Sequence, residues 1–88
     1  MNYRVQWDAD AFRRLRQIWV RADEPQAALQ AFDAIEHQLG ANAEQQGESR
    51  AGDRRILIVP PLGVIFRARP EIGEVMILDA WMVRKRKS

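Results

Sequence analysis

The chain lacks cysteine altogether and has a single histidine, His37, among its 88 residues. Without cysteine there is no disulfide framework, and one histidine leaves too few good ligands for a zinc site. Serine is also scarce, because only Ser49 and Ser88 occur, and neither lies in the sharp turn that holds a hydrolase nucleophile. We therefore expect no metal ion and no acyl-transfer chemistry, and we interpret His37 as a solvated residue on a helix surface.

A glycine-rich phosphate loop and a long apolar segment are missing too. The glycines are scattered and none opens a helix after a strand, so we expect no nucleotide or other small-molecule cofactor. The longest apolar stretch, residues 56–66, is broken by Pro60 and Gly63 and is much shorter than the roughly 20 residues of a membrane helix. The first residues carry no apolar leader, so we expect a cytoplasmic protein without a membrane partner.

What the chain has in quantity is arginine. Its net charge is only +2, but of the 14 basic residues all except Lys85 and Lys87 are arginine. The planar guanidinium group suits phosphate and carboxylate partners better than the point charge of lysine does. The length fits one domain, residues 1–88, which we expect to end in a basic tail at residues 84–88.

The first half of the chain has the patterns of a strand followed by two helices. Apolar residues alternate over residues 2–7, as in a strand with one buried face. Asp8 or Asp10 can cap a first helix, Pro25 suits the first turn of a second, and Gly40 is expected to end it. Residues 41–53 show no apolar periodicity and are interpreted as a mobile loop.

The second half predicts three strands. Residues 55–59 and 64–69 flank a tight connection, and residues 75–83 are apolar on both faces, as in a central strand. The order β-α-α-β-β-β predicts an α+β fold in which a helical hairpin packs on a largely antiparallel sheet. The side chains expected to form the core are Phe12, Leu15, Trp19, Phe32, Ile35 and Leu39 of the helices and Val64, Phe66 and Ala68 of the sheet.

Arginines on the predicted strands are the candidate functional residues. Strand alternation puts Arg67 and Arg69 on the face opposite Phe66, and Arg55 begins the neighbouring strand. Such a cluster can bind a phosphate backbone and stabilise the negative charge that develops in phosphoryl transfer. The alternative is that these are solvated arginines paired with carboxylates such as Asp53. The residues alone leave both interpretations open.

Several short segments, each weak alone, combine into one resemblance. They are residues 3–7, 11–19, 27–39, 47–50 (Gly47-Glu48-Ser49-Arg50), 54–57, 61–67 and 75–83. In this combination the whole chain resembles the RelE/ParE superfamily of toxins from bacterial type II toxin-antitoxin modules. The family has a compact fold with the element order derived above.

The resemblance implies a toxin that an acidic antitoxin neutralises. Ribonuclease members of the family cleave messenger RNA on the ribosome, the 2′-hydroxyl group attacking the adjacent phosphate without a metal ion. The expected function is therefore a translation-inhibiting toxin, with the ribosome and messenger RNA as partners. ParE-like inhibition of DNA gyrase and a non-toxic remnant that only binds the antitoxin are the alternatives.

The resemblance also assigns roles to individual residues. Arg55 looks like a basic residue of the family's second strand and Arg84 like the arginine after the last strand. Arg67 or Arg69 is an imperfect substitute for the family's third-strand arginine, and the candidate catalytic residues are Arg55, Arg67 and Arg84. Contacts to RNA or to the partner are expected from Arg50, Arg54, Arg69, Lys85 and Arg86. The chain departs from the family pattern near Gly63, where a third-strand arginine is expected, and it has no C-terminal tyrosine, its only tyrosine being Tyr3.

Overall fold

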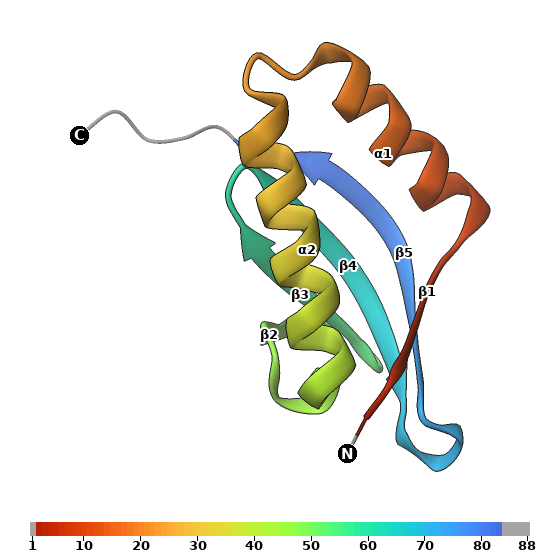
Figure 1. Ribbon diagram of the computed structural model, residues 1–88. Coiled ribbons are helices and arrows are strands. Elements are labelled where there is room, and N and C mark those ends of the chain that lie inside the picture. The colour runs from red at the N-terminus through yellow and green to blue at the C-terminus, as the bar shows by residue number, and fades with distance from the viewer. Residues whose placement is uncertain (1, 84–88) are drawn as a thin grey trace.

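Two helices cover one face of a five-stranded sheet (Figure 1). The computed structural model describes residues 2–83. The strands are β1 (Arg4–Trp7), β2 (Glu48–Ser49), β3 (Arg54–Val59), β4 (Leu62–Arg69) and β5 (Glu74–Met82). The helices are α1 (Ala9–Arg21) and α2 (Pro25–Asn42), and short 3₁₀ turns lie at Ala43–Gln45 and Pro70–Ile72. This is the expected α+β fold.

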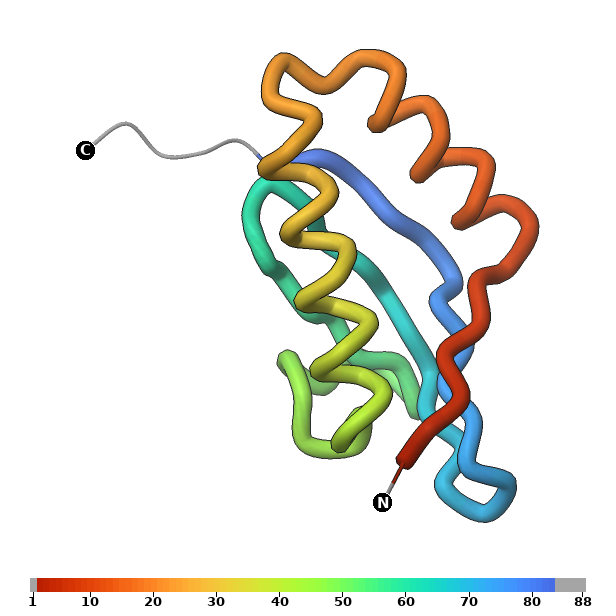
Figure 2. The backbone as a smooth tube through the Cα atoms, in the orientation of Figure 1, coloured from red at the N-terminus to blue at the C-terminus, as the bar shows by residue number. Residues whose placement is uncertain are grey.

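The first and the last strand of the described chain, β1 and β5, pair with each other in the sheet. Its strand order is β1-β5-β4-β3-β2, and only the β1–β5 pair is parallel. Strand β1 pairs with β5 from Glu74 to Ile77, so the last part of β5 continues beyond it. Helix α1 lies along that part of β5, as the course of the backbone in Figure 2 shows.

Local sequence determines where the two helices begin, whereas a contact with β1 involves the C-terminal part of α2. The Asp8 side chain accepts a hydrogen bond from the Asp10 amide (3.1 Å) and caps α1, and Pro25 occupies the first turn of α2. The expectation that Gly40 ends α2 is wrong, because the helix continues to Asn42. Instead the Gly40 carbonyl accepts a hydrogen bond from the Tyr3 amide (2.6 Å), which ties the helix to the start of β1.

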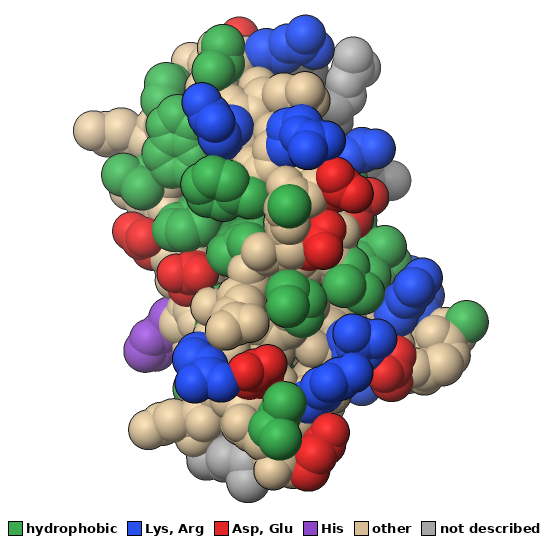
Figure 3. Space-filling view, turned by 90° about the vertical axis from the view of Figure 1, so that its right-hand side faces the viewer, with side chains coloured by type: hydrophobic (Ala, Val, Ile, Leu, Met, Phe, Trp, Pro, Cys, Tyr) green, Lys and Arg blue, Asp and Glu red, His purple; other side chains and the backbone are tan. Residues whose placement is uncertain are grey.

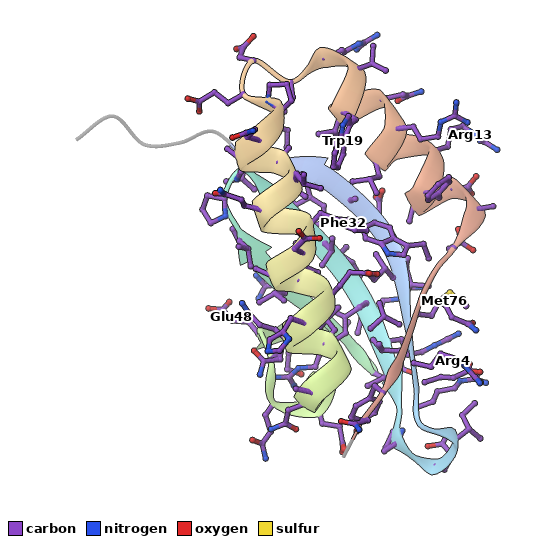
Figure 4. All side chains as sticks on the ribbon, in the orientation of Figure 1. Arg4, Arg13, Trp19, Phe32, Glu48 and Met76 are labelled. Carbon is purple, nitrogen blue, oxygen red and sulfur yellow. The ribbon has the colours of Figure 1, made fainter. Side chains whose placement is uncertain are left out.

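The core lies between the helices and one face of the sheet. Its fully buried large side chains are Leu62, Val64 and Phe66 of β4, Val75 and Ile77 of β5, and Ile35 and Leu39 of α2. Phe32 is half-buried and packs between Trp7, at a ring-centroid distance of 5.7 Å, and Trp19, at 6.2 Å (Figure 4). Phe12 is not a core residue: α1 lies along β5 on its Ala11 and Leu15 side, which leaves Phe12 51% exposed.

Two further expectations need correction. Residues 41–53 are not a structureless loop, because they hold a 3₁₀ turn and β2, which pairs with β3. Strand β5 is not buried on both faces either. Val75, Ile77 and Ala80 are buried beneath the helices, whereas Met76 and Trp81 on the other face are partly exposed.

No helix within residues 2–83 has the length and apolarity needed to cross a membrane.

Phe66 and Phe12 offer a matched test of this packing. Phe66 is fully buried, so Phe66→Ala should lower the free energy of unfolding by about 3–5 kcal/mol through lost apolar burial and the cavity left behind. Phe12→Ala removes the same side chain from an exposed position and should change that energy by about 0.5 kcal/mol or less. Urea denaturation of both variants measures the difference, and equal losses would contradict the arrangement of α1.

Candidate nucleic-acid interface

The sheet has a face that no helix of the described residues covers, here called the open face (Figure 1). Because Val64 and Phe66 point into the core, strand alternation turns Ile65 and Arg67 to the open face. Cross-strand pairs on this face are Arg54–Arg67, Ile56–Ile65, Ile58–Gly63, Gly63–Trp81, Ile65–Asp79, Arg67–Met76 and Arg69–Glu74. One end of the open face is therefore basic, and the other is apolar.

The basic end holds more guanidinium groups than carboxylates. Four arginines lie here: Arg54 of β3, Arg67 and Arg69 of the neighbouring β4, and Arg4 of the edge strand β1. Glu74 forms an ion pair with Arg4, and Asp53 lies near Arg67, with 3.9 Å between Arg67 Nε and Asp53 Oδ2. Arg54 and Arg67 lie directly opposite each other, an arrangement of like charges that destabilises a sheet and that a bound anion relieves.

Arg55 lies on the other side of the sheet from this cluster. Its register partner is the buried Phe66, which places Arg55 on the helix-covered face. There Nε donates to the Gln46 carbonyl (2.7 Å) and Nη2 to the Gly47 carbonyl (3.0 Å). The structure thus brings Arg54, Arg67 and Arg69 together but not Arg55, whose guanidinium group holds the segment before β2.

Glycine is required where Arg55 holds this segment. Gly47 has a φ of +69°, and a Cβ atom there would come within 2.1 Å of the Ile56 carbonyl oxygen. The close approach brings the Gly47 carbonyl to Arg55. The backbone and the side chain therefore fix β2 together.

The remaining predicted site residues are placed as follows. Arg50 lies beside the cluster: its amide donates to the Arg54 carbonyl (2.8 Å), and its side chain pairs with Glu48 at 3.5 Å. Arg84, Lys85 and Arg86 lie outside the described residues.

Neither Tyr3 nor His37 is on the open face. The Tyr3 hydroxyl donates a hydrogen bond to the Glu44 carboxylate, and this bond together with burial raises the pKa of Tyr3 to about 12. His37 is exposed on α2, on the helix side of the sheet. Within residues 2–83 the open face therefore presents neither a histidine, a tyrosine nor a lysine for proton transfer.

Trp81 is a candidate binding residue that the sequence did not indicate. The sequence places it in a strand that is apolar on both faces, as in a central strand, and β5 does lie between β1 and β4, but Trp81 is partly exposed and lies opposite Gly63. It also lines a cavity of about 280 Å³ together with Arg14, Gln17 and Arg21 of α1. Figure 3, which views the molecule from the side of α1 and β1, shows basic side chains gathered over the upper part, where α1 lies.

The contacts of Arg55 can be tested by comparing a substitution at this position with the same substitution at Arg54. Arg55→Lys replaces two separate N–H donors by one ammonium group, so the unfolding free energy should fall by about 1–3 kcal/mol. Amide hydrogen exchange should also quicken at Gly47 and Glu48. Arg54→Lys, at an exposed position one residue away, should change neither quantity appreciably. Equal effects at both positions would show that Arg55 does not hold the segment.

The Tyr3–Glu44 hydrogen bond predicts a dependence of stability on pH. The pKa of Tyr3 is about 12 in the folded protein against 10.0 for an unperturbed tyrosine, so folding favours the protonated phenol. Its contribution is complete below about pH 10 and is lost as the pH rises through about 12. The difference in melting temperature between the parent protein and Tyr3→Phe should therefore shrink over that range. A difference that stays constant would disprove the linkage.

Neither a protein-family model nor a curated protein matches the sequence. Among solved structures, a chain of the toxin-antitoxin complex RelBE2 from Mycobacterium tuberculosis matches with a TM-score of 0.74 and 15% identity, covering 93% of this chain and 99% of that one. The E. coli toxin RelE, a double mutant in the free state, matches with a TM-score of 0.72 and 12% identity over 93% and 84% of the two chains.

Two further structures carry the same fold in different settings. The chromosomal ParDE toxin-antitoxin system of P. aeruginosa matches with a TM-score of 0.62 and 24% identity over 93% of this chain and 97% of that one. TrmO from Pseudomonas aeruginosa matches with a TM-score of 0.60 and 25% identity, but only 35% of its chain is covered. The chain therefore has the fold of the RelE/ParE toxins.

Proposed function

We propose that this protein is the toxin of a toxin-antitoxin pair and that it acts on RNA through the open face. The observation that carries the proposal is the extent of the likeness. In free RelE and in the two toxin-antitoxin structures the match covers most of the matching chain, from 84% to 99%, whereas in TrmO it covers about a third. The likeness to these structures also covers 93% of this chain.

The arginine cluster supports a phosphate-bearing target. Arg54, Arg67 and Arg69 share the open face, and the ion pairs nearby leave the cluster net positive. Guanidinium groups in this arrangement bind the sugar-phosphate backbone and stabilise charge on a phosphate under attack. The first candidate activity is metal-independent cleavage of messenger RNA on the ribosome, in the cytoplasm.

In that reaction the 2′-oxygen bonds to the adjacent phosphorus and the bond to the 5′-oxygen breaks. A base removes the 2′-hydroxyl proton, and an acid returns a proton to the 5′-oxygen. Arginine transfers protons poorly, so within residues 2–83 these transfers are left to carboxylates such as Asp53 or to groups of the ribosome.

Inhibition of DNA gyrase is the second candidate function. The specific observation in its favour is the missing proton-transfer group, since the open face of residues 2–83 carries no histidine, tyrosine or lysine. A toxin that blocks gyrase needs no such group. A non-toxic protein that keeps only antitoxin binding is the third reading of the same fold.

Helix α1 offers the antitoxin a surface of its own. Phe12 and Val20 are exposed on this helix, and Arg13, Arg16 and Arg21 line a shallow hollow together with Val20. An acidic amphipathic segment complements both features, since its apolar side chains cover the exposed pair and its carboxylates meet the arginines. Such an association should be fast and weakened by salt.

Inducing the chain with and without its antitoxin tests the proposal. Growth should stop on induction and recover when the antitoxin is supplied, and primer extension on cellular messages should reveal discrete cuts. Arg67→Gln removes a charge-stabilising donor and should reduce the cutting rate by about 10²- to 10³-fold. Arg13→Gln, which changes an arginine on the outer side of α1 (Figure 4), should cut like the parent protein.

Three outcomes separate the candidates. Intact messages with altered DNA supercoiling would replace RNA cleavage by gyrase inhibition. Normal growth while folded protein accumulates would remove toxicity altogether. Parental cutting by Arg67→Gln would remove the arginine cluster from the mechanism but leave the toxin assignment in place.

A further inference from the structure

The indole ring of Trp81 is seated on the backbone of the neighbouring strand. A Cβ atom at Gly63 would lie 2.7, 2.8 and 2.9 Å from three atoms of the indole, Cε2, Nε1 and Cζ2. The ring therefore lies against the bare backbone of Gly63, and any side chain at that position would collide with it. Because the strand fixes one face of the ring, its orientation is set before any ligand arrives.

The surroundings of Trp81 are those of a binding site. Trp81 lies on the open face, partly exposed, in the part of the sheet where β1 no longer pairs with β5. The cavity of about 280 Å³ beside it is lined by the guanidinium groups of Arg14 and Arg21 and by the Gln17 amide. Arg14 forms an ion pair with Asp79, at 3.2 Å between Arg14 Nε and Asp79 Oδ1, so Arg21 is the guanidinium group better placed to meet a ligand. A second cavity of about 550 Å³ shares Arg14 and Gln17 and extends toward Leu78 and Asp79.

These groups match the parts of a nucleotide. A flat ring held at a sheet surface stacks on any base, guanidinium groups bind phosphates, and an amide forms hydrogen bonds with base edges. The basic cluster lies on the same face, and Arg67 is four residues from Gly63 along β4, or about 13 Å. One extended strand of nucleic acid can thus reach both Trp81 and Arg67.

We propose that Trp81 is a base-stacking platform for single-stranded RNA, with Arg21 holding an adjacent phosphate. This inference rests on the proposed function for the choice of RNA as the target. It adds a positioning residue to the arginine cluster: the stacked base fixes where the strand crosses the open face. The competing reading, that Trp81 merely shields Gly63 and the edge of β5, assigns it no ligand.

Binding of a short unstructured oligoribonucleotide, labelled with a fluorophore and titrated with the full chain at several salt concentrations, tests the platform. Trp81→Leu keeps an apolar cover over Gly63 but removes the aromatic ring, so affinity should fall about 5- to 150-fold. The salt dependence should stay as in the parent protein, since stacking releases no counterions. Trp81→Phe should recover part of the affinity.

Two control variants make the result specific. Arg67→Gln should weaken binding and reduce the slope of log K against log salt by about 0.7, because one phosphate contact is lost. Ile58→Ala removes an exposed aliphatic side chain that lies opposite Gly63 on the same face and should leave the affinity unchanged. Thermal melting of each variant establishes that it is folded.

The results that would overturn the platform are separate from those that bear on toxicity. Parental affinity in a folded Trp81→Leu variant, or no binding of the oligoribonucleotide by the parent protein, would refute base stacking. Loss of antitoxin affinity alone on Trp81→Leu would make this surface a protein-docking site instead. Binding that depends on Trp81 in a protein that does not arrest growth would keep the platform and refute the proposed toxin function.

Discussion

Burial of one side of β4 is the constraint on which the rest of the molecule depends. Leu62, Val64 and Phe66 are fully buried beneath the helices, together with Val75 and Ile77 of the neighbouring strand. Because side chains alternate along a strand, this burial commits the intervening residues of the same strands to the open face. A shift of the strand by one residue would turn the arginines into the core and the core side chains to the open face. The packing of the helices therefore fixes the position of the basic cluster.

This dependence explains what the sequence could predict and what it could not. The apolar alternation around Phe66 correctly placed Arg67 and Arg69 on one face, and the order of the elements was recovered. The sequence could not show that Arg55 lies on the opposite face from them, because the face to which its side chain points depends on the register between β3 and β4. The predictions that Phe12 is buried and that α2 ends at Gly40 were also wrong, because both features depend on where a helix meets the sheet. Helix α1 lies along β5, and the Gly40 carbonyl accepts a hydrogen bond from the Tyr3 amide.

Trp81 is a residue on the open face that the sequence alone could not identify as a candidate binding residue. Its strand is apolar on both faces, a pattern shared by central strands covered on two sides and by strands with an apolar binding surface. Only the arrangement of the helices distinguishes the two. The one local signal was a glycine inside a predicted strand, which often marks the close approach of another group. Here that group is an indole ring.

The Gly63–Trp81 pair also bears on how this surface differs from the pattern of the RelE/ParE family. The resemblance places a third-strand arginine near position 63, but the indole ring fills the space that such a side chain needs. An arginine at 63 and a tryptophan at 81 in its present position therefore exclude each other. An indole ring can stack on a nucleic-acid base, whereas an arginine side chain stabilises negative charge on a phosphate. A surface with the ring in place of the arginine is therefore better suited to hold a nucleic-acid strand than to polarise its phosphate. Under the proposed function, the phosphate contacts would then come from Arg67 and Arg69, which the buried face of β4 directs to the open face, and from Arg54, which pairs with Arg67.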